Sequence, residues 1–348
     1  MSTSPRADGT VTGASTPVPH VEAAEHVGDE FGDTIAALRE AAASVAGLDY
    51  LAHYSSGVFN VGLDRLGDPP SPVDAPPGRT RREELRRLGR SLSLTSSGLD
   101  RTLRPARTGG LIRAVLQTER SAEFCNLVVP GEHVVGSVLD LGAPPERPVA
   151  LTRVEVVRAA DIAMAQLATG LRRRISLSSA NPGGWETAEI TATPGNHDPG
   201  GPTVTMHGPL DQRTERLVEA CEGAVHAATL QFVAHCARGK VVFAVDRLGD
   251  RSLAGFFTQV TVAARRSFYL DLSHRLYSLA NKFNKTTTGV LGGVLRRIVL
   301  DVEQGAIYYY RLGTGDYLVG VTIDQAKVSR ADDHMASLAA EARDILAE

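Results

Sequence analysis

The chain of 348 residues has room for about two domains of roughly 150 residues each. Its composition, 43% hydrophobic and 22% charged, is that of a globular protein that can form a core. The formal net charge of −3 argues against bulk attraction to nucleic acid or to an acidic membrane, so neither is expected as a partner.

The cysteines and the N-terminus bear on the cellular compartment. Cys125, Cys221 and Cys236 have neither the spacing of a disulfide framework nor a CxxC pair, which fits a reducing cytosol. The N-terminus lacks the basic region and apolar run of a signal peptide. No window approaches the roughly 18 consecutive apolar residues that a membrane-spanning helix needs. We expect a soluble, cytoplasmic protein.

A five-residue motif, Asp-Arg-Leu-Gly-Asp, stands at positions 64–68 and again at positions 246–250. Self-similarity at a fixed period predicts two tandem copies of one structural unit. Further pairs keep the same order along both copies, namely Leu48 and Leu230, Ala52 and Ala234, His53 and His235, Gly57 and Gly239, and the segments Gly109–Arg113 and Gly292–Arg296.

The composition of the flanking segments sets the domain boundaries. Residues 1–28 are rich in Ser, Thr, Pro, Ala and Gly and cannot bury enough apolar surface to order, so they are predicted to be a disordered tail. The first repeat then covers 29–178 and the second 209–348. The segment 179–208 is dense in Gly and Pro, which predicts an exposed linker, with a short strand at 188–193.

Each copy is predicted to begin with an amphipathic helix, the first from Asp29 and the second after Asp211, which is placed as its cap. A short apolar strand follows, at 58–63 and at 241–245, and leads into the repeated turn, where Gly and Asp suit a tight reversal. The helical stripes are Ile35, Leu38, Ala42 and Val45 in the first copy and Leu217, Cys221, Ala224 and Ala228 in the second.

The copies then diverge. The first has a Pro-rich loop at 69–78 and a basic helix through 79–90, whereas the second is predicted to form a strand at 252–263 and then a helix. Glu83 and Glu84 interrupt the arginines, and no aromatic residue lies among them. This pattern is typical of a solvated helix face, with docking of an acidic partner or nucleic acid as the alternative.

Three strands and a closing helix are predicted to end both copies. The last helix of the second copy has Ser329 and Asp332 at the spacing of a capping box. The predicted strands are 111–118, 123–129 and 134–139 in the first copy and 294–302, 306–311 and 317–323 in the second.

The C-terminal part of the second copy combines the strand at 294–300, the Gly-Ala-Ile-Tyr-Tyr-Tyr strand at 305–310, the Gly-Asp-Tyr-Leu-Val-Gly-Val segment at 315–321 and an Ala-rich closing helix. In this order they resemble the Roadblock (dynein light chain) family. The first copy resembles the family mainly through its likeness to the second, and its Pro-rich loop and basic helix depart from the family pattern.

The resemblance implies an α+β fold of two tandem repeats, each a mostly antiparallel sheet flanked by helices as in Roadblock and profilin folds, arranged as a pseudo-dimer. Members of the family are non-catalytic, pair through their sheets and helices, and often regulate or anchor small Ras-like GTPases, in some bacteria within signalling systems. It therefore implies a cytoplasmic, non-enzymatic adaptor for a partner protein, a Ras-like GTPase, that can also form homo-oligomers.

Two groups of residues are candidates for a partner interface. Arg65 and Arg247 belong to the repeated turn, where the alternative is turn-making and Asp–Arg pairing with Asp64 and Asp246. The tyrosines at 308–310 alternate faces along a strand, so at least one ring of Tyr308, Tyr309 and Tyr310 is expected to point away from the core and lie at a contact.

Two other function classes stay open. GAF-type ligand-binding domains have a similar order of strands and helices, and a well-formed apolar pocket with converging polar groups in one copy would favour that class. The segment Gly195–Asp198, with His197, looks like one block of the calcineurin-type metallophosphoesterases. The Asp-x-His and Gly-His-x-His blocks that complete such a site are missing.

His53 and His235 are predicted to lie at the ends of the first helices, as a pH-sensitive or ligand-binding pair or as residues that bond terminal carbonyls. No phosphate-binding loop, GxGxxG context, zinc spacing or nucleophile elbow is found in the sequence. No cofactor and no metal are therefore expected, and the protein is predicted not to be an enzyme.

Overall fold

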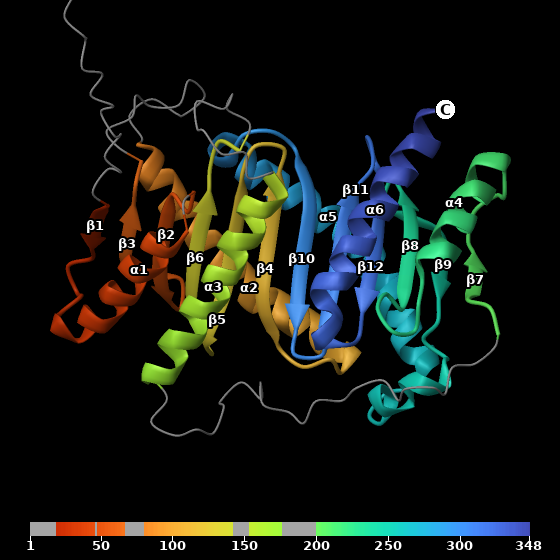
Figure 1. Cartoon of the computed structure of the whole chain (residues 1–348), viewed down its shortest axis with the longest axis horizontal. Helices are drawn as coiled ribbons and strands as arrows, with labels where there is room; N and C mark the ends of the chain where they lie inside the picture. Colours follow the sequence, from red (N-terminus) through yellow and green to blue (C-terminus); the bar gives the residue numbers. More distant parts are fainter. Residues whose placement is uncertain (1–18, 46, 67–79, 142–152, 176–199) are drawn as a thin grey trace, which may run out of the picture.

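A computed structural model describes residues 19–45, 47–66, 80–141, 153–175 and 200–348. We call residues 19–175 the N-terminal half and residues 200–348 the C-terminal half. The architecture is mixed α and β, with a single antiparallel sheet between two layers of helices (Figure 1). The coarse class expected from the sequence is therefore confirmed.

The sheet contains twelve strands within the described residues, in the order β1-β3-β2-β6-β5-β4-β10-β11-β12-β8-β9-β7. The strands of the N-terminal half are β1 (His20–Ala23), β2 (Tyr50–Ser55), β3 (Val58–Asp64), β4 (Leu111–Thr118), β5 (Ala122–Val129) and β6 (Glu132–Val138). Those of the C-terminal half are β7 (Thr203–Met206), β8 (Phe232–Ala237), β9 (Lys240–Asp246), β10 (Leu295–Val302), β11 (Gly305–Arg311) and β12 (Asp316–Thr322).

The halves meet where β4 pairs with β10, in an antiparallel register that places Val115 opposite Val299. From this junction outward, the strands of each half follow in the same relative order. The sheet therefore continues from one half into the other without an unpaired edge at the centre, as the row of strands in Figure 1 shows. An exposed edge there would invite pairing with other chains, and the β4–β10 ladder removes it.

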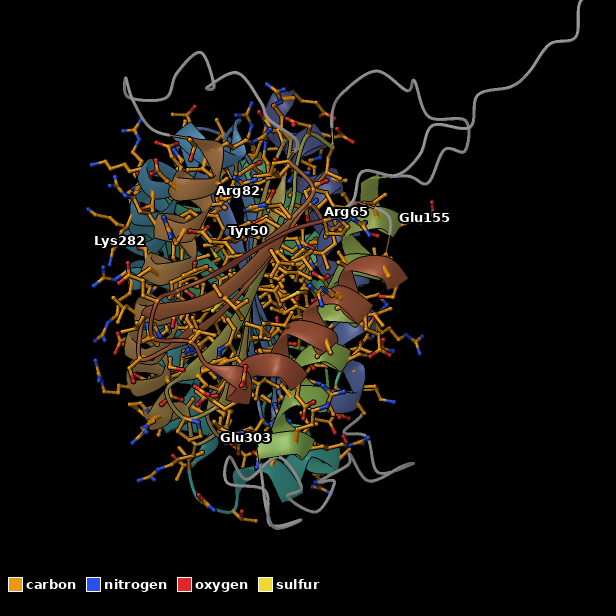
Figure 2. All side chains as sticks on the ribbon, turned by 90° about the vertical axis from the view of Figure 1, so that its left-hand side faces the viewer. Tyr50, Arg65, Arg82, Glu155, Lys282 and Glu303 are labelled. Atoms are coloured by element: carbon orange, nitrogen blue, oxygen red, sulfur yellow. The ribbon has the colours of Figure 1, made fainter. Side chains whose placement is uncertain are left out.

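The helices divide between the two faces of the sheet. On one face lie α2 (Arg81–Leu103) and α5 (Val262–Leu291), which pack on one apolar cluster. On the other lie α1 (Gly32–Ser44), α3 (Arg153–Ile175), α4 (Gln212–Ala224) and α6 (Val328–Ala347). Figure 2 shows the two layers on opposite sides of the strands. Short 3-10 helices are η1 (Asp29–Phe31), η2 (Arg104–Ala106), η3 (Arg251–Phe257) and η4 (Gln325–Lys327).

Several contacts recur at corresponding positions of the two halves. Phe124 lies opposite Gly136 in the β5–β6 pair, and Tyr308 lies opposite Gly320 in the β11–β12 pair. Each of these glycines lies against a methionine of the closing helix, Met164 or Met335, and a side chain there would collide with the sulfur. The helices α2 and α5 also correspond, because a side chain of each accepts a hydrogen bond from the backbone amide of the first residue of a strand. The Leu111 amide donates to Asp100, and the Leu295 amide donates to Asn284.

Most of the predicted elements are confirmed. The strands β4–β6 and β10–β12 agree with the sequence-based boundaries to within one or two residues, and a closing helix, α3 or α6, follows each set of three strands as predicted. Asp211 caps α4 as predicted, since its carboxylate accepts a hydrogen bond of 2.7 Å from the Thr214 amide. The basic segment begins α2, and Thr80 and Glu83 form a capping box at its start.

The strands β2 and β8 are not predicted by the sequence pattern. They are buried over nearly their whole length because helices cover both faces of the sheet. Their apolar residues therefore form a continuous run rather than an alternating pattern. The prediction that His53 and His235 end helices is wrong, because both lie within these strands.

Two local predictions in the C-terminal half are also wrong. Residues 252–263 do not form a strand: η3 starts after Asp250, whose carboxylate accepts from the Ser252 amide at 2.9 Å, and α5 starts at Val262. Ser329 and Asp332 do not form a capping box. The α6 helix begins one residue before Ser329, and the Asp332 carboxylate instead binds Arg297.

Two short strands lie inside segments that the sequence assigned to a tail and a linker. β1, within the predicted disordered tail 1–28, pairs with β3, and β7, within the predicted linker, pairs with β9. Backbone hydrogen bonding to the sheet orders these segments although they carry few large apolar side chains. Residues 1–18, the Pro-rich loop 69–78 and the predicted strand 188–193 lie outside the described residues.

Candidate docking surface

The repeated turn at each end of the sheet is anchored by an aspartate. Asp64 receives two hydrogen bonds from Arg82 of α2, at 2.5 and 2.9 Å, and Asp246 receives two from Arg266 of α5, at 2.6 and 2.8 Å. Both carboxylates are almost fully buried. Each also accepts from the backbone amide two residues later, which closes the turn. The turn-making alternative is thus confirmed for these aspartates, with helix arginines as their partners.

The arginines of the turn lie elsewhere. Arg65 is half-buried at the end of β3, where its backbone amide donates to the Asp49 carbonyl, and Figure 2 places it toward the α1 and α3 side. Arg247 is also half-buried, and its guanidinium donates to the Gly200 carbonyl at 3.0 Å. A partner-binding role for these two residues stays a prediction.

The prediction that one of the three tyrosines points outward is wrong. Tyr308, Tyr309 and Tyr310 are all buried, with at most 6% of the residue exposed. Tyr308 and Tyr310 pack in the cluster beneath α6, and Tyr309 packs in the cluster beneath α5. Both faces of β11 are covered by helices, so alternation along the strand places no ring in solvent. These residues cannot form an accessible interface in this arrangement.

The two histidines occupy corresponding places in the halves. Nε2 of His53 lies 3.4 Å from the Glu132 carboxylate, and Nε2 of His235 lies 3.6 Å from that of Asp316. His53 also contacts the Asn60 side chain at 3.0 Å. A hydrogen bond from His53 lowers the pKa of Glu132, against the opposing effect of burial. The histidines lie in different halves of the sheet and do not form one ligand-binding pair.

A charged cluster lies beneath α3 and α6 at the junction of the halves. Arg113 of β4 lies 2.7 Å from Asp161 of α3 and also pairs with Asp301 of β10. In the register of the sheet its counterpart is Arg297, one residue later than the sequence match with Arg296 indicates. Arg297 pairs with Asp332 of α6, and its Nη1 donates to Gln117 Oε1 of β4 at 3.0 Å. Each arginine therefore joins the closing helix of its own half to the central strand of the other half.

Asp301 and Gln117 break the symmetry of this cluster, since they are corresponding positions with different charge. Burial raises the pKa of Asp301 to about 6, although Arg113 opposes this shift. Burial lowers the pKa of Arg113, and Asp301 and Asp161 outweigh it, so the net shift is upward. The cluster therefore holds an ion pair at neutral pH and fixes the two halves relative to each other.

The helix layer of α2 and α5 is the strongly basic side of the molecule. Together these helices contain 11 Lys and Arg against 4 Asp and Glu, whereas α1, α3, α4 and α6 contain 10 against 11. The chain as a whole has a net charge of −3, so its positive charge is concentrated on one face. Such segregation produces a local potential of opposite sign to the net charge.

The exposed side chains of α2 follow one stripe at helical spacing: Arg87, Arg90, Leu94, Ser97 and Arg101. Leu94 is 52% exposed, so an apolar contact point lies in the middle of the stripe. Beside it, α5 exposes Arg275, Lys282 and Lys285, and Figure 2 shows Lys282 directed outward from this layer. We call these residues together with Arg104 the basic face.

The basic face is open for a partner. Within the described residues, no carboxylate lies within ion-pair distance of Arg87, Arg90 or Arg101, while Arg82 and Arg266 in the same helices are held by buried aspartates. The inner arginines therefore fix the helices to the sheet, and the outer ones present charge to solvent. This arrangement suits electrostatic attraction of an acidic surface.

In the part of the chain that the structure describes, no group of three or more His, Cys, Asp and Glu side chains is arranged to hold a metal ion. None of the described helices is both long and apolar enough to cross a membrane. The Gly195–Asp198 segment with His197 lies outside the described residues.

Comparison with known proteins gives a partial likeness. No family model matches the chain, and no curated protein matches it. Among solved structures, it is similar to one described as MglB with tetrameric arrangement, at 18% identity and a TM-score of 0.30, over 42% of this chain and 90% of that one. It is also similar to the gliding protein MglB from Thermus thermophilus, at 17% identity, the same TM-score and the same coverage.

The sequence pattern indicates only half of the basic face. The arginines at 79–90 stand out because they are close together, but the bases of α5 are spread from Arg275 to Lys285. Their spacing of seven and three residues places them on one side of a helix, and this spacing could have indicated a second basic stripe. That α2 and α5 lie side by side follows from the pairing of β4 with β10 and not from either helix alone.

Proposed function

We propose that the protein is a non-enzymatic adaptor built as an intramolecular pseudo-dimer of two Roadblock-like repeats, and that its basic face docks an acidic partner protein. The observation that carries this proposal is the stripe of outward arginines along α2, beside the exposed bases of α5. A charged surface of this kind steers an oppositely charged partner and selects against others.

The pseudo-dimer is supported by the strand order, which runs outward identically from the β4–β10 junction, and by three sets of matched contacts. These are the Asp–Arg pairs of the repeated turn, the glycine–methionine contacts under the closing helices, and the two arginines of the junction. In a fused pair the two repeats are free to diverge, so one chain can present unequal surfaces to a single partner.

A Ras-like GTPase is the partner class that the family resemblance of the sequence implies. Because helices cover both faces of the sheet, a partner that docks on a face contacts a helix layer, and the α2 and α5 layer has the larger net positive charge. Because the contact includes Leu94 as well as arginines, binding would combine apolar burial with electrostatic steering.

The test is affinity purification of the full chain from its native cell, in parallel with GDP and with a non-hydrolysable GTP analogue, followed by mass spectrometry. We expect a GTPase to be retained in one nucleotide state, and to be lost when Arg87 and Arg90 are both changed to Glu. Recovery of an acidic protein that is not a GTPase would retain the docking surface and reject the GTPase. Recovery that is insensitive to the charge reversal would reject the surface.

A further inference from the structure

The N-terminal half contains a cavity of about 510 Å³ between the C-terminal part of α2 and the sheet. The sheet supplies its floor, with Leu111, Cys125, Leu127 and His133. Ser96 and Ser97 of α2 form a wall, and Asp100 and Glu303 lie at the end where β4 begins and β10 ends. Figure 2 shows Glu303 at this edge of the sheet, between the helix layers.

The cavity exists because the two halves differ at corresponding positions. In the register that matches β5 and β6 to β11 and β12, Cys125 corresponds to Tyr309 and His133 to Tyr317. The rings of Tyr309 and Tyr317 lie 5.0 Å apart, and Tyr277, at the position of Ser93, stacks on Tyr317 at 5.8 Å. Three aromatic rings therefore fill the C-terminal half where the N-terminal half has smaller, polar side chains.

The inner wall of the cavity is polar but uncharged. His133 Nδ1 lies 3.0 Å from the Ser93 hydroxyl, and the Ser96 hydroxyl donates to Cys125 Sγ at 3.4 Å. Burial lowers the pKa of His133 to about 4, so the imidazole is neutral at pH 7. A ligand with an apolar body and one weakly polar group suits such a wall, because the tyrosine side chains that fill the same place in the C-terminal half have this character.

The mouth of the cavity combines two carboxylates, Asp100 and Glu303, with two exposed arginines, Arg101 and Arg104. A side-chain carbon on Gly110 would lie 3.2 Å from Asp100 Oδ1 and 3.4 Å from Glu303 Oε1, so both carboxylates approach the same stretch of bare backbone. Asp100 accepts from the Leu111 amide at 2.9 Å and from the largely exposed Arg104 at 3.2 Å. Burial and the charge of Asp100 raise the pKa of Glu303, although the Gly110 backbone opposes this.

Glu303 lacks a compensating cation. No Lys, Arg or His of the described chain forms an ion pair with it, whereas Glu119, its counterpart on the other side of the junction, binds Arg296. Arg101 and Arg104 line the cavity from solvent with exposed side chains, and Arg104 pairs with Asp100 rather than with Glu303. A half-buried carboxylate beside a second carboxylate is best satisfied by a bound cation or a strong hydrogen-bond donor.

We infer that this cavity binds a small amphipathic amine or amidine, whose aromatic or aliphatic body takes the place of the tyrosine rings and whose cationic group lies between Asp100 and Glu303. Such a ligand site goes beyond the docking function proposed above and does not depend on it. It gives the N-terminal half a sensing role that the ring-filled C-terminal half lacks.

Three matched probes test the inference by calorimetry and ligand-observed NMR on the full chain. Tyramine has the phenol body and an ammonium group, p-cresol has the body alone, and 3-(4-hydroxyphenyl)propionate has the body with a carboxylate. We expect tyramine to bind at least roughly 10-fold more tightly than the other two. No tyramine binding at concentrations up to about 5 mM, or preference for the propionate, would overturn the proposal.

Two variants assign the site. Glu303→Gln should weaken tyramine binding by roughly 10-fold and leave p-cresol unchanged, whereas the matched control Glu119→Gln should leave both unchanged. Ser97→Phe, a change at an exposed position on the cavity wall, should abolish binding of all probes while the circular dichroism of the protein stays the same. Tyramine binding that survives both Glu303→Gln and Ser97→Phe would place it elsewhere and reject the site.

Discussion

Arg113 of β4 pairs with Asp301 of β10, across the strand boundary that joins the two halves of the sheet. Both groups are withdrawn from solvent, and Arg113 also binds Asp161 of the closing helix α3. A buried ion pair contributes little net stability over an apolar pair, but removing one partner leaves an uncompensated charge. The contact therefore specifies how the halves meet more than it adds to their stability.

We expect Arg113→Ala to lower the free energy of unfolding by about 3 kcal/mol, because Asp301 is left buried without its cation. Urea denaturation at pH 7 measures this. The double variant Arg113→Ala with Asp301→Asn should recover part of the loss. Arg104→Ala, which breaks an exposed pair with Asp100, is the control and should cost less than about 1 kcal/mol. Equal losses of unfolding free energy in Arg113→Ala and Arg104→Ala would contradict the assignment of Arg113 to a buried ion pair between the halves.

The repeated turn predicts a matched pair of effects. Arg82→Ala and Arg266→Ala each leave a buried aspartate, Asp64 or Asp246, without the two hydrogen bonds that the guanidinium donates. Each change should lower the free energy of unfolding by about 3 kcal/mol, and the two values should agree to within about 1 kcal/mol. Calorimetric or urea melts of the two variants test this. A large cost for one and none for the other would argue against equivalent halves.

Glu123 makes stability depend on pH. It is fully buried in β5, where its counterpart in β11 is Ile307, and burial raises its pKa well above the usual value, with Ser137 opposing. The folded chain therefore binds this proton more tightly than the unfolded chain, so stability is greatest below about pH 4.3, the unfolded value, and falls as pH rises above it. Unfolding titrations between pH 4 and pH 8 measure the slope.

Glu123→Gln should flatten that slope and raise stability at pH 7, because the amide is uncharged in both states. Glu123→Ile copies the residue of the other half and should act in the same direction. Asp301, with a pKa of about 6, adds a dependence of the same sign that remains in both variants and ends near pH 6. A slope that is unchanged by either Glu123 variant would show that the carboxyl is ionised or hydrated in the folded protein.

The basic face predicts a salt-dependent interaction. Changing Arg87 and Arg90 to Glu should weaken partner binding by roughly 10-fold or more at low salt and by less at high salt, since screening reduces the attraction. Arg173→Glu on α3 reverses an exposed charge on the opposite layer and serves as the control. Binding isotherms of both variants at two salt concentrations distinguish an effect of the basic face from an effect of overall charge. An equal effect of Arg173→Glu would attribute binding to overall charge.

Some elements of the fold can be predicted from local sequence alone. The strands β10 to β12 and the helix α6 can be predicted because the chain alternates short apolar runs, tight turns and one helical stripe, and each signal acts over a few residues. The repeat of Asp64 and Asp246 predicts two similar units, and both aspartates do anchor matching turns. These features depend on residues that are close together in the sequence, so one sequence is enough to predict them.

The tertiary structure decided the rest. Helices cover both faces of the sheet, and no local sequence pattern indicates this. For this reason Tyr308 to Tyr310 are buried and β2 is not predicted. The β4–β10 pairing brings Arg113 to Asp301 and sets α2 beside α5, so a chain of net charge −3 presents a basic face. The cavity near Glu303 arises from differences between distant positions such as Cys125 and Tyr309, which correspond only through the shared register of the two halves.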